Sequence, residues 1–214
     1  MINPHRIILS ALFISTICGG MQCDKEEYQH HFLEKVELSP ERKSYNVGDT
    51  IWLQYSNPDN RFFDRFKRLD LGIDSALISF ELKLNAQYNT PVGPPDGFCD
   101  FVTAGGVNNG RYLYDYRTSL STMIGCDNNA YNFKIGVVLK QKGIYSLEMP
   151  LDFSLQSCPL RANRIPLSRI EYQFNIIDGN KEVYQAIPLS LRMDGSGYME
   201  NEIDNKRAMM IQVD

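Results

Sequence analysis

After His31 the sequence contains no histidine, and only three histidines occur among its 214 residues. His5 lies in a leader that we expect to be removed, while His30 and His31 lie in a polar, charged stretch that we expect to be a solvated tether. The folded part of the chain then has no histidine that can act as a general base for a serine or cysteine nucleophile. The sequence therefore favours a non-catalytic protein.

Three further features are missing, and each excludes a class of function. The apolar run at residues 7–17 is far shorter than the roughly 20 residues that a membrane-spanning helix needs. The net charge is −4, so there is no basic excess to neutralise phosphates, and nucleic acid is not an expected partner. No Cys-x-x-Cys spacing occurs, and we expect neither a metal site nor a cofactor.

The N-terminus has the parts of a secretory signal peptide. Residues 1–22 contain a cationic start at Arg6, the apolar residues 7–17, and small residues at Gly19 and Gly20. The residues that follow are Cys23, Asp24, Lys25, Glu26 and Glu27.

This arrangement resembles the N-terminus of Bacteroidota surface lipoproteins. The resemblance implies that Cys23 is acylated, and that the four residues after it direct export to the outer face of the outer membrane. Residues 20–22 differ from the usual Leu-Ala-Gly type of tripeptide, and the alternative is cleavage after Gly20, which leaves Cys23 as a thiol. The predicted organisation is a signal peptide at 1–22, an acylated cysteine with a flexible tether at 23–34, and a single domain at 35–214.

From residue 36 onward, apolar residues recur with a period of two, which predicts β-strands. Residues 76–84 and 170–176 show this period. Residues 133–140 and 144–151 flank a turn that contains Gly143, and they predict a hairpin in which every large apolar side chain lies on one face.

The strand pattern indicates an all-β fold, because turn signals such as Asp178-Gly179 are frequent and no long amphipathic helix is evident. The sequences VEL at 36–38, YNVGDTIWL at 45–53 and GIYSL at 143–147 are similar to strands of immunoglobulin-like domains. The resemblance implies an immunoglobulin-like antiparallel β-sandwich with long loops. We expect residues 85–132 to be loop-rich and residues 60–71 to contain a helical turn.

Three cysteines follow Cys23, and an oxidising compartment allows two of them to pair. The register of the predicted hairpin places Cys126 opposite Cys158, and we predict this disulfide. The alternatives are a bridge between Cys99 and Cys126, or no disulfide.

Aromatic residues mark two candidate ligand-binding positions. Tyr112, Tyr114 and Tyr116 alternate along one predicted strand, so their rings share a face and can stack on a sugar ring or on apolar side chains of a protein. The alternative is that these rings fill the core. Trp52 is out of phase with the apolar residues of its strand, so we expect it on the outer face, as a contact site or covered by a loop or the tether.

Two further interpretations concern charged residues. Residues 60–68 combine aromatic and cationic side chains, which can approach lipid headgroups or an acidic glycan, or can cap one end of the core. Glycoside hydrolysis needs only two carboxylates across a cleft. The candidate aspartates, whose spacing selects no pair, are Asp64, Asp70, Asp96, Asp100 and Asp127.

Together these features predict a non-catalytic, lipid-anchored protein of the cell envelope that is displayed on the outer membrane. Its expected partners are the membrane, through Cys23, and a glycan or an envelope protein. An accessory subunit of an outer-membrane complex is a second interpretation. A carboxylate-dependent glycoside hydrolase that acts on surface polysaccharide is a third.

Overall fold

The computed structural model describes residues 30–73, 76–88, 97–104, 108–114, 117–125, 131–149, 153–157, 168–192 and 197–214. The predicted signal peptide, Cys23 and the four residues of the predicted export signal lie outside these ranges. The described strands are β1 (His30–Ser39), β2 (Ser44–Tyr45), β3 (Thr50–Asn57), β4 (Arg61–Asp64), β5 (Leu69–Gly72), β6 (Ala76–Tyr88), β7 (Cys99–Ala104), β8 (Asn108–Tyr114), β9 (Arg117–Gly125), β10 (Tyr131–Leu139), β11 (Gly143–Glu148), β12 (Phe153–Ser157), β13 (Ser168–Asn175) and β14 (Ala208–Val213). The described helices are α2 (Lys181–Gln185), the 3-10 turn η1 (Leu189–Leu191) and α3 (Tyr198–Asp204). Within the described ranges, no helix has the length and apolar character needed to cross a membrane.

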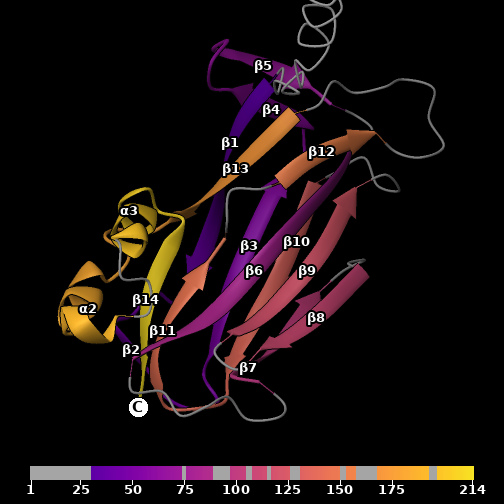
Figure 1. Ribbon diagram of the computed structural model, residues 1–214. Helices are drawn as coiled ribbons and strands as arrows, with labels where there is room; N and C mark the ends of the chain where they lie inside the picture. The colour runs from indigo at the N-terminus through magenta and orange to yellow at the C-terminus, as the bar shows by residue number, and fades with distance from the viewer. Residues whose placement is uncertain are drawn as a thin grey trace, which may run out of the picture.

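The strands form two layers that face one another, so the fold is a mainly-β, two-sheet sandwich (Figure 1). We call the layer β8-β9-β6-β11-β14-β2 the front sheet and the layer β7-β10-β3-β1-β13 the back sheet. β12 pairs with β6 of the front sheet and with β13 of the back sheet, and it joins the layers at one end. β4 and β5 form a hairpin that is attached to the first residues of β1. The all-β sandwich predicted from the sequence is confirmed.

The core lies between the two sheets and is built from inward residues that strands of both sheets contribute. β3 and β13 show this directly, because buried residues alternate with more exposed ones along both strands. The period-two patterns at residues 76–84 and 170–176 correspond to β6 and β13. Ile78, Leu82 and Ile170 of these strands are fully buried.

The hairpin predicted from residues 133–140 and 144–151 does not form. β10 pairs with β3 and β7 in the back sheet, whereas β11 pairs with β6 and β14 in the front sheet. The chain between them crosses from one layer to the other, so Val137 and Leu147 are both buried but face the core from opposite sheets. A period of two buries the same residues in either arrangement, and it therefore does not identify the neighbouring strand.

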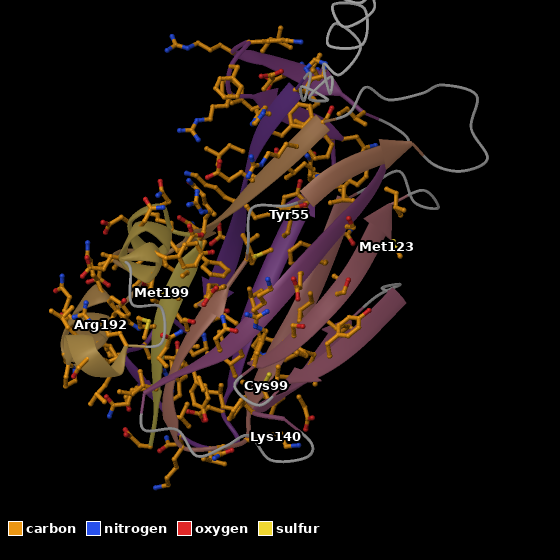
Figure 2. All side chains as sticks on the ribbon, viewed as in Figure 1. Tyr55, Cys99, Met123, Lys140, Arg192 and Met199 are labelled. Carbon is orange, nitrogen blue, oxygen red and sulfur yellow. The ribbon has the colours of Figure 1, made fainter. Side chains whose placement is uncertain are left out.

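The register that predicted the Cys126–Cys158 disulfide belongs to the hairpin that does not form. Both of these cysteines lie outside the described residues. Cys99, the first residue of β7, is buried near the lower end of the molecule as drawn in Figure 2.

Other departures from the sequence prediction also concern pairing. β1 with β13 and β2 with β14 are parallel pairs in a sandwich predicted to be antiparallel. Residues 85–132, predicted to be loop-rich, contribute β7, β8 and β9. Residues 60–71 form the β4–β5 hairpin and not a helical turn.

Two short helices that the sequence analysis misses cover the β14 edge of the front sheet. α2 and α3 lie against β14 (Figure 1). They bury a second, smaller apolar cluster, composed of Tyr184, Ile187, Met199, Ile203, Ala208 and Met210.

The folded domain begins earlier than predicted. β1 starts at His30 and pairs in parallel with β13 along residues 30–37, so residues 30–34 belong to the sheet and not to a tether. The physical reason is the alternation of Phe32 and Val36, which are both buried in the core. The two histidines predicted to be solvated in the tether are therefore part of the domain.

Candidate functional site

The outer face of β8, β9 and β6 is a regular array of side chains. Alternate residues of a strand point to opposite faces, so the strand register determines which residues are neighbours on this surface. We call the surface the Tyr–Ser face, and its cross-strand rows are Tyr112–Ser119–Lys83, Ser121–Glu81, Met123–Ser79 and Arg117–Asn85.

Tyr112 is the exposed aromatic residue of the Tyr–Ser face. Its exposed fraction is 50%, so the alternative in which its ring fills the core is wrong. Next to it lie partly exposed Ser121 and the ion pair between Lys83 and Glu81, whose Nζ–Oε2 distance is 3.0 Å. Ser119, the Cα partner of Tyr112, is completely buried, so its hydroxyl is closed to a partner. Exposed Met123 extends the face along β9 (Figure 2). The rigid, amphipathic ring of tyrosine beside small polar side chains is typical of protein-binding surfaces.

The predicted row of three tyrosines is only partly within the described structure. β8 ends at Tyr114, two residues after Tyr112. The side chain of Tyr114 and the whole of Tyr116 lie outside the described part of the chain. Tyr112 is thus the member of the row that the structure places on the Tyr–Ser face.

A chain of polar side chains closes one end of the Tyr–Ser face. Gln87 Nε2 donates to Ser146 Oγ at 2.8 Å, and Ser146 Oγ donates to Glu148 Oε1. Asn85 Nδ2 donates to the same carboxylate oxygen at 2.6 Å, and Arg117 Nε donates to Asn85 Oδ1 at 2.7 Å. Burial raises the pKa of Glu148, and the hydrogen bonds from Ser146 and Asn85 oppose that rise. These bonds tie β6, β9 and β11 together at that end of the face.

Trp52 lies on the outer face of the back sheet, as its strand parity predicts. Its ring packs over Gly136 of β10, where an added Cβ would lie 2.9 Å from the indole. Lys134 Nζ lies above the ring, 4.9 Å from its centroid. The neighbouring strand and this lysine therefore cover part of the indole. Because Trp52 and Tyr112 lie on opposite sheets, they do not belong to one site.

Glu34 is a carboxylate on the core side of β1 that the sequence analysis misses, because it assigns this residue to the tether. Its Cα partner is Tyr172 of β13, and Tyr55 Oη donates to Glu34 Oε2 at 3.1 Å. Burial raises the pKa of Glu34 to about 7; the Tyr55 hydrogen bond lowers it, and the negative charge of Asp70 raises it further. The alternation of Phe32, Glu34 and Val36 is the signal in the sequence that predicts this inward position.

His30 and Asp64 form a second arrangement that the sequence analysis does not predict. His30 Nδ1 lies 2.7 Å from Asp64 Oδ2, and the Asp64 side chain is completely buried. The argument against catalysis from a histidine-free domain is therefore wrong. Ser168 is the Cα partner of His30 in β13, but it is also completely buried, so its hydroxyl is closed to a substrate.

The five candidate aspartates are not brought together within the described structure. Asp64 ends β4, Asp70 lies in β5, and Asp100 lies in β7. Asp96 and Asp127 lie outside the described residues. Asp64, Asp70 and Asp100 each belong to a different strand.

Comparison with solved structures gives distant likenesses, among them cohesin modules. No protein-family model and no curated protein sequence matches this chain. The seventh ScaB type I cohesin from Pseudobacteroides cellulosolvens is similar at 12% identity and a TM-score of 0.33, over 86% of this chain and 93% of the cohesin. A type II Cohesin-X-Dockerin complex from Acetivibrio cellulolyticus (11%, TM-score 0.36) and a cohesin module from a family 33 glycoside hydrolase of Clostridium perfringens (9%, TM-score 0.31) each match 66% of this chain, and 95% and 99% of their own. The likeness is one of β-sandwich architecture alone.

Proposed function

We propose that this chain is a non-catalytic module of the cell envelope that is anchored through acylated Cys23 and binds a protein partner through the Tyr–Ser face. The single observation that carries the binding proposal is half-exposed Tyr112, which lies beside partly exposed Ser121 and the Lys83–Glu81 ion pair on a hydrogen-bonded sheet. Such a surface offers a large amphipathic ring at a low entropic cost, surrounded by adaptable hydrogen-bonding groups.

The surface is also held rigid before any partner arrives. β9 pairs with β8 on one side and with β6 on the other, and the Asn85–Glu148 network fixes the end of the array. Gln87 Oε1 in this network is buried and has no hydrogen-bond partner within the described residues. A surface that is already ordered loses less conformational entropy when it binds.

The binding proposal is tested by site-specific photocrosslinking in intact cells. A photoreactive phenylalanine at position 112 is expected to give a discrete crosslinked protein, while the same residue at Val102 gives none. Val102 is a suitable control because it is 46% exposed but lies on the opposite sheet. Equal crosslinking at both positions contradicts the proposal, and binding of the purified protein to a glycan array that requires Tyr112 would identify a sugar ligand instead.

The anchoring proposal is tested separately with Cys23→Ser. The wild-type protein is expected to take up labelled fatty acid and to fractionate with membranes. The Cys23→Ser protein is expected to lose the label, because the acylated atom is absent. Labelling of the serine variant contradicts the anchor, and it has no consequence for the binding role of Tyr112.

A further inference from the structure

The β4–β5 hairpin concentrates positive charge in an acidic protein. Residues 61–70 contain four cationic and two acidic residues, although the net charge of the chain is −4. One of the two acids, Asp64, is buried and bonded to His30, which leaves Asp70 as the exposed acid of the segment. The exposed cations are Arg61, Arg65, Lys67 and Arg68, and of these Arg65 pairs with Glu171 at 3.4 Å.

The same hairpin exposes apolar side chains beside these cations. Phe62 packs into the core and so fixes the hairpin to the domain. The centroid of its ring lies 5.4 Å from that of Phe32 and 5.1 Å from that of Tyr131. Phe63, on the other face of β4, is half-exposed, and Phe66 in the turn is 71% exposed. The hairpin therefore presents aromatic rings and cations together, while its other face is fixed to the domain.

The turn that carries Phe66 is held in one conformation. Asp64 Oδ1 accepts the backbone N–H groups of Phe66 and Lys67 at 2.9 and 3.0 Å. The backbone N–H of Arg68 donates to the carbonyl of Asp64 at 2.8 Å, and Arg68 adopts a φ of 53°. The exposed ring and its cationic neighbours are thus presented without an ordering cost at the moment of contact.

The hairpin lies where the chain enters the domain. Phe32 of β1 pairs with Asp64 of β4, and the backbone N–H of Arg65 donates to the carbonyl of His31 at 2.8 Å. Figure 1 shows β4 and β5 beside the start of β1, at the end of the sandwich remote from the C-terminus. Cys23 precedes His30 by only seven residues, which span at most about 25 Å when fully extended.

We infer that the β4–β5 hairpin rests on the membrane surface, where its cations contact anionic lipid headgroups and its phenylalanines enter the interface. The inference relies on the proposed anchor for its geometry, because a lipid on Cys23 holds this end of the domain nearest to the bilayer. A lipid chain together with a basic, apolar contact is one of the combinations that give stable membrane association. The Tyr–Ser face, which lies along the side of the sandwich and not at the hairpin end, then remains open to a partner (Figure 1).

The experiment measures vesicle binding without the acyl anchor. The exported Cys23→Ser protein is sedimented with vesicles of phosphatidylcholine, with or without about 30% phosphatidylglycerol. Binding is expected to be about tenfold stronger to the anionic vesicles and to weaken in high salt, because surface charges are screened. Phe63→Ser/Phe66→Ser and Arg61→Gln/Arg68→Gln, each added to Cys23→Ser, are each expected to reduce that binding several-fold.

The matched control is Ile177→Ser/Leu189→Ser in the same Cys23→Ser background. These two apolar residues are 85% and 78% exposed but lie outside the hairpin, so their replacement is expected to leave vesicle binding unchanged. Circular dichroism and the urea midpoint confirm that each variant is folded. Equal binding by the hairpin variants and the control overturns the inference, as does binding to heparin with none to vesicles. Intact vesicle binding together with unlabelled Cys23 in the wild type supports the hairpin contact and overturns only the anchor.

Discussion

Glu148, which is buried, and Glu34, which is partly buried, are two carboxylates of the same domain that differ in what surrounds them. Glu148 accepts hydrogen bonds from Ser146 and Asn85, and the positive charge of Arg117 acts on it through space. Glu34 accepts one hydrogen bond, from the phenol of Tyr55. Burial raises the pKa of both groups, and for Glu34 it reaches about 7, whereas donors and positive charges oppose the rise at Glu148.

The difference shows that the degree of burial alone does not determine the pKa of a carboxyl group. Glu148 is only 6% exposed, yet each donor replaces a hydrogen bond that water would have made. Glu34 lies on the core side of β1, where its neighbours are aromatic rings and the carboxylate of Asp70. Removing the first carboxylate is therefore expected to destabilise the fold, while neutralising the second is expected to stabilise it near neutral pH.

Glu148→Leu gives the largest expected effect. It leaves the donors of Asn85 and Ser146 buried without an acceptor, and the loss is expected to be about 2–4 kcal/mol of unfolding free energy. Urea denaturation at pH 7 measures it. Glu148→Gln keeps an acceptor oxygen and serves as the control, with an expected loss below about 1 kcal/mol. A Glu148→Leu protein as stable as the wild type would contradict the role given to this network.

Glu34→Gln is expected to change stability in the opposite direction, and only at higher pH. The pKa of Glu34 rises from 4.5 to about 7 on folding, so its favourable contribution is complete below pH 4.5 and is lost as the pH rises through 7. At pH 8 the variant is expected to be more stable than the wild type by about 1–3 kcal/mol, and near pH 4.5 the two are expected to be equal.

The same urea measurements at both pH values test the Glu34 prediction. Glu37→Gln is the matched control, because Glu37 lies on the exposed face of the same strand. A stability difference between wild type and Glu34→Gln that does not change from pH 4.5 to pH 8 would mean that Glu34 titrates normally.

The contrast between the two glutamates also shows what the sequence can predict. Period-two patterns predict correctly that residues 76–84 and 170–176 are half-buried strands and that Trp52 faces outward, because each inference needs only the strand itself. The same patterns predict a wrong neighbour for β10, because two strands that face each other across a core have the same alternation as two strands in a hairpin.

In the candidate site, too, the sequence predicts what depends on a single strand but not what depends on the pairing of strands. The exposure of Tyr112 is compatible with its alternation in the sequence, but its neighbours Ser119 and Lys83 depend on the pairing of β9 with β8 and β6. The Glu148 network joins residues more than 60 positions apart in the sequence, as in the bond between Asn85 and Glu148. No local pattern contains such a contact, whereas the inward position of Glu34 follows from the alternation of Phe32 and Val36.

Asp64→Asn gives the smallest expected effect and extends the comparison to a third buried carboxylate. Burial alone would raise the pKa of Asp64, but the backbone N–H groups of Lys67 and Phe66 and the bond to His30 lower it below its ordinary value. Its stabilising contribution is therefore present above about pH 4 and is lost as the pH falls through the lowered pKa. Asn keeps one acceptor oxygen but not the charge, so the variant is expected to be about 1 kcal/mol less stable at pH 7, with a smaller difference below pH 3. Exposed Asp59→Asn is the control, and equal losses for both variants at pH 7 would show that the charge of Asp64 does not stabilise the turn.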